Sequence, residues 1–276
     1  MRFDNEIITS RNNKLVKWFS SLQDKKYRNI EGYFLAEGVK LTVEAFDAGL
    51  PVEYCIVNEE KKDAVISAFS DYFEDEKYAE CRVITVSNGV FEKISTEKAP
   101  QGIISVIKHL DFFREMDIIY KEEFFLEEGE RAIFLHSVRD PLNLGAVIRS
   151  SVAFGTDHII LSDDCADIYN PKTIRSAMAS LYRVKITKIK DVPSFIRAAM
   201  ENGRRVFAAE LTARAKSLSE ISLTSSDIVM IGNEGHGIPS EISEISSGSV
   251  YIPISKKTES LNASVAAAIF MWEQSK

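Results

Sequence analysis

The sequence has few of the features that mark secreted, metal-binding or membrane-spanning proteins. Its only cysteines, Cys55, Cys81 and Cys165, lie far apart and form no Cys-x-x-Cys pair. Neither a disulfide framework nor a zinc knuckle is therefore indicated. No run approaches the ~20 apolar residues of a membrane-spanning helix, and the first residues contain no apolar signal core. We expect a reduced, cytoplasmic protein that uses no metal ion and no membrane.

The chain has fewer basic than acidic residues overall, but its basic residues are concentrated in one stretch. The formal net charge of −7 argues mildly against a general nucleic-acid coat protein, although the distribution of charge matters more than its sum. Basic residues gather near the start of the chain with few acids among them: Arg11, Lys14, Lys17, Lys25, Lys26 and Arg28. Two interpretations stay open for this cluster, a solvated helix face and a surface that contacts RNA phosphates.

Buried strands alternate with helices in two separate stretches of the chain. Predicted strands at residues 33–36, 52–57, 82–86 and 102–107 indicate a small α/β domain over residues 1–108, a normal domain size. Residues 109–130 mix aromatic and acidic side chains, and we interpret them as a connecting segment with some helix. The alternation restarts at residues 132–135 and predicts a second α/β domain over residues 131–276.

The last forty-odd residues carry small and amide-bearing side chains directly after apolar runs. Residues 228–231 are typical of a strand covered on both faces, and Gly232, Gly235 and Gly237 follow them. This order of glycines matches neither the dinucleotide fingerprint nor a P-loop. The loop is either a tight turn or a place where a ligand approaches the backbone. A ligand would lie at the carboxyl ends of such strands.

Polar residues also stand at the starts of two predicted helices. Asn143 is a candidate N-cap for the helix that carries Arg149, and Ser260 or Asn262 can cap the helix over residues 263–271. A second apolar run, residues 250–254, is predicted to be a strand stopped by Pro253.

Three blocks together resemble the SpoU–TrmH family of RNA ribose 2′-O-methyltransferases, in the SPOUT superfamily. They are Asn143-Leu-Gly-Ala-Val-Ile-Arg149, Gly232-Asn-Glu234-Gly-His-Gly237, and Ile252-Pro253 followed by Ser260-Leu-Asn262-Ala-Ser264. Order and spacing agree as well. Residues 1–108 resemble the L30-like substrate-binding domain often fused in front, and Lys25-Lys-Tyr-Arg28 with Phe34-Leu-Ala-Glu37-Gly38 is similar to the ribosomal-RNA-modifying branch.

The resemblance implies a C-terminal SPOUT domain with a trefoil knot, an exception to the rule that chains avoid threading. It also implies a homodimer and S-adenosylmethionine as methyl donor. The catalytic residues that it implies are Asn143, Arg149, Glu234, Ser260 and Asn262, with Glu234 fixing the loop of the second motif and orienting Arg149. The cofactor-binding residues that it implies are Ala209, Glu210, Leu211, Ile231, Gly232, Gly237, Ile252, Leu261 and Ser264.

Methyl transfer to a ribose hydroxyl requires in-line positioning of the two reacting atoms and a group that removes or stabilises the hydroxyl proton. A guanidinium is almost always protonated, with a reference pKa above ~12. We therefore favour Arg149 as a ligand of the phosphate beside the ribose that also stabilises the developing oxyanion. Ribosomal RNA is the favoured substrate. A tRNA substrate and a catalytically silent RNA-binding factor remain alternatives, and a Rossmann-type small-molecule enzyme ranks last because its fingerprint is missing.

Overall fold

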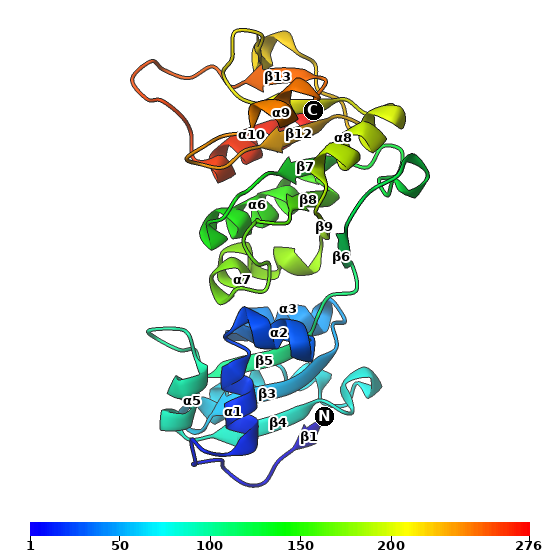
Figure 1. Ribbon diagram of the computed structural model, residues 1–276. Coiled ribbons are helices and arrows are strands. Elements are labelled where there is room, and N and C mark those ends of the chain that lie inside the picture. Colours follow the sequence, from blue (N-terminus) through cyan, green and yellow to red (C-terminus); the bar gives the residue numbers. More distant parts are fainter. The chain divides into compact units, whose positions relative to one another are not determined.

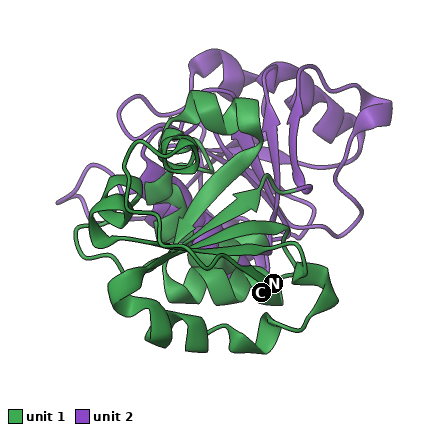
Figure 2. Cartoon of the chain, turned by 90° about the horizontal axis from the view of Figure 1, so that it is seen from below, with its two compact units in different colours: residues 1–110, 167–182 green, residues 111–166, 183–276 purple.

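The computed structural model describes all residues from 1 to 276 and divides into two compact units. Unit 1 consists of residues 1–110 and 167–182, and unit 2 of residues 111–166 and 183–276 (Figure 2). Each unit is built around its own β-sheet with helices against it (Figure 1). None of the helices has the length and apolar character needed to cross a membrane.

Unit 1 contains a five-stranded sheet in the order β1-β4-β3-β5-β2. Its strands are β1 Arg2–Phe3, β2 Tyr33–Glu37, β3 Val52–Asn58, β4 Arg82–Val86 and β5 Ile103–Lys108. β5 runs antiparallel to both β2 and β3, whereas β4 runs parallel to β1 and β3. The sheet is therefore mixed, as is common in small α/β domains.

Helices cover both faces of this sheet. They are α1 Lys14–Ser21, α2 Lys25–Glu31, α3 Val39–Asp47, α4 Lys62–Ser67, α5 Asn88–Ile94 and α7 Pro171–Ala177. Short 3₁₀ turns lie at Glu59–Lys61, Ser70–Tyr72, Glu76–Tyr78 and Met178–Tyr182. The apolar sides of α1 and α5, with Phe19 and Phe91 fully buried, pack on one face of the strands. On the opposite face, Thr42 of α3 shares a buried hydrogen bond with Ser105 of β5.

Unit 2 contains an eight-stranded sheet in the order β11-β13-β10-β12-β7-β8-β9-β6. All of its strand pairs are parallel. The strands are β6 Phe113–Met116, β7 Ala132–Leu135, β8 His158–Ser162, β9 Lys185–Ile189, β10 Val206–Ala209, β11 Lys216–Ser217, β12 Ile228–Ile231 and β13 Gly248–Tyr251. Because helices cover both faces, the central strands β7 and β12 are apolar at every position.

The helices of unit 2 are α6 Pro141–Phe154, α8 Val192–Glu201, α9 Ser240–Glu244 and α10 Ala263–Gln274. Two 3₁₀ turns lie at Lys121–Glu123 and Leu218–Glu220. Phe195 of α8 packs against Phe134 of β7 and Met230 of β12 on one face of the sheet. Since successive strand residues point to opposite faces, Ile133 and Val229 point to the other face, where α6 and α10 pack on each other and on the strands.

The order of the strands has one switch point that matters for function. From β7 the chain proceeds outward through β8 and β9, whereas β12, β10 and β13 lie on the other side of β7. The loops after β7 and β12 therefore leave neighbouring strands in different directions. In open parallel sheets such a switch point leaves a crevice at the carboxyl ends of the strands, where ligands bind.

The predicted α/β class and most predicted elements are confirmed. The second apolar run forms strand β13, which ends at Tyr251. Pro253, which was expected to stop this strand, has no N–H to donate to the ladder. Residues 109–130, expected to be a connecting segment with some helix, contain the 3₁₀ turn Lys121–Glu123. They also supply the edge strand β6, which was not predicted and pairs with β9. The domain boundaries at residues 108 and 130 stay a prediction.

Candidate active site

Three residues from the three distant motifs form one row of hydrogen bonds in unit 2. The Asn143 side-chain amide donates from Nδ2 to Glu234 Oε1 at 2.6 Å. The Asn262 amide donates from Nδ2 to Asn143 Oδ1 at 2.9 Å. Asn143 is thus bonded through both ends of its amide. Side chains that are 91 and 119 residues away in sequence meet on it.

The start of α6 explains why the Asn143 side chain is available for this row. Asn143 was predicted to be the N-cap, but that prediction is wrong, because Asp140 caps the helix by accepting a hydrogen bond from Leu142 N. Pro141 occupies the first helical position, where its missing N–H costs nothing. Asn143 therefore lies within the first turn, and its amide is free to reach Glu234 and Asn262.

The loop that carries Glu234 is folded tightly on itself. Asn233 and Gly237 exchange backbone hydrogen bonds of 3.1 and 2.9 Å, and Asn233 Oδ1 accepts from the amides of Gly235 and His236. A Cβ placed on Gly232 would lie 2.5 Å from the carbonyl carbon of Gly237. Gly232 is thus required by the close approach of its own loop, and Gly237 by a φ of 68°.

Asn262 has a second function at the start of α10. Its Oδ1 accepts hydrogen bonds from Ser264 N and, at 2.6 Å, from Ser264 Oγ. The predicted capping role of Asn262 is therefore confirmed. One side chain both begins α10 and joins the row of hydrogen bonds with Asn143.

Two of the predicted catalytic residues do not join this row. Arg149 lies exposed on α6 and makes no hydrogen bond or ion pair within the chain. Glu234 contacts Asn143 and not Arg149, so the expectation that Glu234 orients Arg149 is not met within one chain. Ser260 is exposed, and its backbone carbonyl accepts from Thr258 Oγ1 at 3.2 Å. The side chains of Arg149 and Ser260 are therefore free to contact a substrate.

Most residues expected to bind the cofactor lie together at the carboxyl edge of the sheet. Ala209 ends β10 and pairs with Ile231 at the end of β12 and with Val250 of β13. Ile252 directly follows β13. Leu211 has an apolar side chain that is 79% exposed. This edge therefore presents small and apolar groups beside backbone ends, a surface suited to an adenosine.

Glu210 is engaged by its own unit. Its Oε1 accepts hydrogen bonds from Ser249 Oγ at 2.6 Å and from Ser243 Oγ, and its backbone N–H donates to Val250 O. The carboxylate therefore ties β10, α9 and β13 together.

The basic residues near the start of unit 1 divide into two groups. Arg11, Lys14 and Lys17 are exposed in and before α1, and Lys25 and Lys26 are exposed in α2. Arg28 is different, because its side chain is 2% exposed and bonds to Leu22 O, Gln23 O and Asp167. A buried, paired guanidinium cannot reach a phosphate, so Arg28 does not belong to an RNA-contacting surface.

A further polar cluster lies next to the loop that carries Glu234, and it was not predicted from the sequence. Ser137, Arg139 and Ser162 all donate hydrogen bonds to the carboxylate of Asp164 at 2.7 Å. Burial acts to raise the pKa of Asp164, but these three donors outweigh it and lower the pKa to about 2. Beside it, burial lowers the pKa of His136. Because these contacts join separate loops, no local spacing pattern reveals them.

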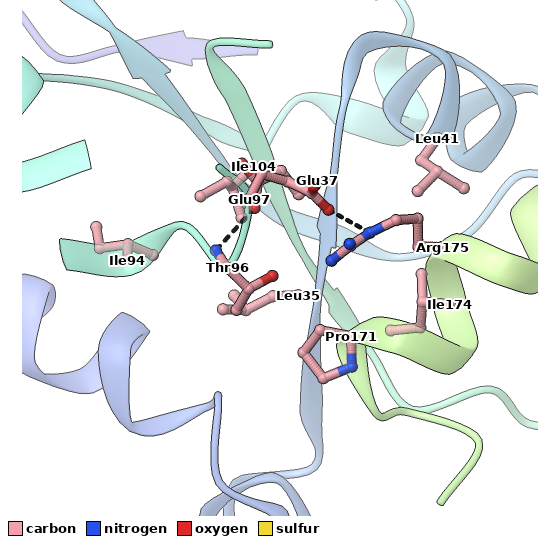
Figure 3. A pocket seen from close by; sticks show the side chains of 10 residues that line it. All are labelled: Leu35, Glu37, Leu41, Ile94, Thr96, Glu97, Ile104, Pro171, Ile174 and Arg175. Atoms are coloured by element: carbon pink, nitrogen blue, oxygen red, sulfur yellow. Dashed lines mark hydrogen bonds and ion pairs between the residues drawn. The ribbon is translucent and has the colours of Figure 1, made fainter. Parts of the chain in front are cut away.

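A pocket in unit 1 is too small to hold a cofactor. Figure 3 shows its lining, which includes Glu37 of β2, Glu97, and Pro171 and Arg175 of α7. Arg175 pairs with Glu97, and Thr96 N donates to Glu37 at 3.1 Å. The cavity has a volume of about 20 Å³, room for about one water molecule. The cavity is a small gap between packed elements.

Comparison with known proteins identifies the family. Residues 130–272 match the model of the SpoU rRNA Methylase family, and residues 13–105 match the MRM3-like substrate binding domain. The chain is 30% identical over 265 residues to the 23S rRNA (guanosine(2553)-2'-O)-methyltransferase RlmP of Bacillus subtilis (strain 168), covering 96% of this chain and 97% of that protein. It is 24% identical to the 23S rRNA (uridine(2479)-2'-O)-methyltransferase of Streptomyces viridochromogenes, covering 96% and 90%.

A solved structure agrees in fold over the full length. The AdoMet-bound rRNA methyltransferase from Sinorhizobium meliloti has a TM-score of 0.79 and 27% sequence identity, covering 98% of this chain and 97% of that chain. The family model covers the three motifs that supply Asn143, Glu234 and Asn262. The chain therefore belongs to the SpoU rRNA methylase family.

Proposed function

We propose that this protein transfers the methyl group of S-adenosylmethionine to a ribose 2′-hydroxyl of ribosomal RNA. The observation that carries the proposal is the row formed by Asn143, Glu234 and Asn262. Each residue comes from a different motif, and the row lies at the switch point of a parallel sheet. The two curated relatives named above are both 23S rRNA 2'-O-methyltransferases.

The carboxyl edge of β10, β12 and β13 is the proposed cofactor site. Apolar Leu211, Ile252 and Leu261 would contact the adenine faces, while backbone groups near Ala209 and Gly232 would bond its edge. The exposure of Leu211, at 79%, fits an apolar side chain that a ligand covers. When bound, S-adenosylmethionine supplies an electrophilic methyl group on a sulfonium.

The chain itself must position the ribose and handle charge on the attacking oxygen. Arg149 has no partner within the chain and remains fully available to bind the phosphate beside the target ribose. Its positive charge also stabilises negative charge on the oxygen as the proton leaves. The proton passes to an acceptor such as a phosphate oxygen. Asn143, Asn262 and Ser260 offer amide and hydroxyl groups to the sugar.

A second copy of the chain is the proposed partner of α6 and α10. An open apolar groove of about 360 Å³ runs between these helices, lined by Ser150, Phe154, Ser264, Val265, Ala268, Ile269 and Trp272. Val265 and Trp272 are 47% and 48% exposed. Exposed apolar patches of this kind mark protein interfaces. Ser150 of the groove directly follows Arg149, so a homodimer would bring a second chain close to the active site.

The proposed RNA-contacting surface of unit 1 consists of Arg11, Lys14, Lys17, Lys25 and Lys26. The exposure of these side chains supports contact with phosphates. Tyr27 of α2, which was not among the predicted RNA-binding residues, is 43% exposed beside Lys26. An exposed tyrosine next to basic residues can stack on an unpaired base.

Three further proposals concern the whole protein. We propose that its C-terminal part forms a trefoil knot, and that it works in the cytoplasm without a metal ion. The bacterial relatives named for modification of 23S rRNA support the compartment.

The experiment that tests the function is transfer of tritium from labelled S-adenosylmethionine to total RNA from cells that lack this protein. Nuclease mapping then locates the product. Label in one ribose-methylated nucleotide of ribosomal RNA supports the proposal and names the site. Label in tRNA would show that tRNA, and not ribosomal RNA, is the substrate. No label on RNA or on ribosomal particles, with cofactor bound in calorimetry, would indicate a silent RNA-binding factor.

A further inference from the structure

Ser137, the second residue after β7, has a backbone conformation that residues with a side chain rarely adopt. Its φ is 57°, and such strained residues persist only where their surroundings hold them. All three of its polar groups are bonded. Its N–H donates to Ser162 Oγ at 2.8 Å, its Oγ donates to Asp164 at 2.7 Å, and its carbonyl accepts from Asn233 Nδ2 at 2.8 Å. Ser137 therefore joins the loops that follow β7, β8 and β12.

Asp164 is the acceptor that anchors this arrangement. One carboxylate oxygen accepts from Ser162 Oγ, and the other accepts from Ser137 Oγ and from Arg139. Because its pKa lies at about 2, the carboxylate stays ionised, and an acceptor only, at any working pH. Asp164 follows β8 and lies outside all three family-like motifs.

The arrangement continues directly into the row of proposed catalytic residues. Asn233, which bonds the Ser137 carbonyl, also orders the amides of Gly235 and His236 through its Oδ1. Glu234 lies between these residues and accepts the hydrogen bond from Asn143. A shift of Ser137 would therefore displace the loop that sets the position of Glu234.

We propose that Asp164 is a positioning residue for methyl transfer. By holding Ser137 it fixes the loop after β7 against the loop after β12, and so maintains the contact between Asn143 and Glu234. Asp164 does not touch the substrate and acts through Ser137. The inference rests on the proposed function, because positioning has meaning only for a reaction at that row.

The choice of variants separates this role from simple pairing with Arg139. Asp164→Ala removes every acceptor. Asp164→Asn keeps one oxygen that can accept a hydrogen bond from one serine hydroxyl. Its NH₂ group can donate to the other serine hydroxyl, because a hydroxyl accepts as well as donates. The variant loses the negative charge opposite Arg139. If Asp164 acts by holding Ser137, the Asn variant keeps activity within about threefold of the wild type, because both serine bonds survive. If the role of Asp164 were the ion pair with Arg139, the Asp164→Asn variant would lose as much activity as Asp164→Ala.

The test measures kcat and KM for methyl transfer, together with hydrogen exchange of the Gly235 and His236 amides. Asp164→Ala and Ser137→Ala should each lower kcat roughly 10- to 100-fold, the scale of a small misplacement at a reacting centre, with KM for RNA little changed. The double variant should be no worse than Ser137→Ala alone. Both single variants should speed exchange of the two amides while the thermal midpoint of unfolding stays near that of the wild type.

The neighbouring acid provides the matched control. Asp163 pairs with Lys188 at 2.9 Å, and the hydrogen bonds of Ser137 go to other residues, so Asp163→Ala should leave kcat and the exchange of both amides unchanged. The inference is overturned if Asp164→Ala leaves kcat or amide exchange at the wild-type level, or if the effects of the two variants add. If the wild type methylates no RNA, the proposed function fails. Amide exchange then decides alone whether Asp164 holds the loop.

Discussion

At the scale of single residues, Asn143 is the member of the hydrogen-bonded row that contacts both of the others. One end of its amide donates to a carboxylate and the other accepts from an amide, so the neighbours define which way the group points. An aspartate would set a second carboxylate against Glu234, and an alanine would leave Glu234 Oε1 without this donor and Asn262 Nδ2 without its acceptor. The geometry of the row alone therefore favours an amide at this position, apart from the proposed contact with a sugar.

A second residue, His158, is buried at the start of β8 in unit 2. Its Nε2 lies 2.8 Å from Thr187 Oγ1, and its Nδ1 lies 3.4 Å from a carboxylate oxygen of Glu130. Burial lowers the pKa of His158 to about 4, and the attraction of Glu130 raises it by less. His158 is therefore neutral in the folded protein at neutral pH.

Acidification should accordingly destabilise the fold before the carboxylates titrate. Below pH 6.5 the unfolded chain binds a proton at this histidine that the folded chain does not, and the difference persists down to about pH 4. The free energy of unfolding should fall by roughly 2–3 kcal/mol over that window. Urea unfolding at a series of pH values measures it, and His158→Gln should flatten the slope. An equal slope in the variant would contradict the assignment.

At the scale of elements, the local apolar pattern predicted the central strands well, whereas the start of one helix and one edge strand were not predicted. Apolar runs predicted β7 and β12 at the observed residues, because period and burial are local properties. The start of α6 was misplaced, since Asp140 and Asn143 are both good caps and Pro141 decides between them. Strand β6 was missed because it exists only through its pairing with β9.

The exposed basic face of α1 and α2 should contribute to RNA affinity through phosphate contacts. Replacing Lys14, Lys17 and Lys25 by glutamate should weaken binding by at least tenfold at low salt. The dependence of log K on log salt should fall by ~0.7–0.9 for each phosphate that the variant no longer neutralises. Filter binding across a salt series measures both quantities.

The chain offers a control for that experiment. Lys62, in α4, has the same charge but lies outside the basic cluster, so Lys62→Glu should leave the salt dependence unchanged. If the triple variant binds RNA with the wild-type affinity and slope, the cluster is only a solvated face.

At the scale of the whole molecule, the sequence predicted the α/β architecture and the residues of the row, but not how separate loops support each other. Motif order predicted that Asn143, Glu234 and Asn262 matter, and the structure brings them together. Neither the contact of Asp164 with Ser137 nor the buried pair of Arg28 with Asp167 was foreseen. Both depend on chain paths far apart in sequence, and charge alone assigned Arg28 to the surface.

The groove between α6 and α10 should be buried in a homodimer interface. Val265→Glu with Ala268→Glu would place charges in an apolar contact, where their desolvation is costly. Analytical ultracentrifugation at micromolar concentration should show a dimer for the wild type and a monomer for the variant. A wild type that sediments as a monomer would contradict the proposed partner.

The measurement that tests the proposed reaction most directly is ribose methylation of ribosomal RNA by the wild type and by Arg149→Ala. A 2′-O-methyl group blocks alkaline cleavage, so the wild type should leave tritium in one alkali-resistant dinucleotide. Arg149→Ala should lower turnover at least 100-fold, as loss of a charge-stabilising donor does, while calorimetry shows cofactor binding close to that of the wild type. Tritium on a base, or near-normal turnover by Arg149→Ala, would contradict the proposed chemistry.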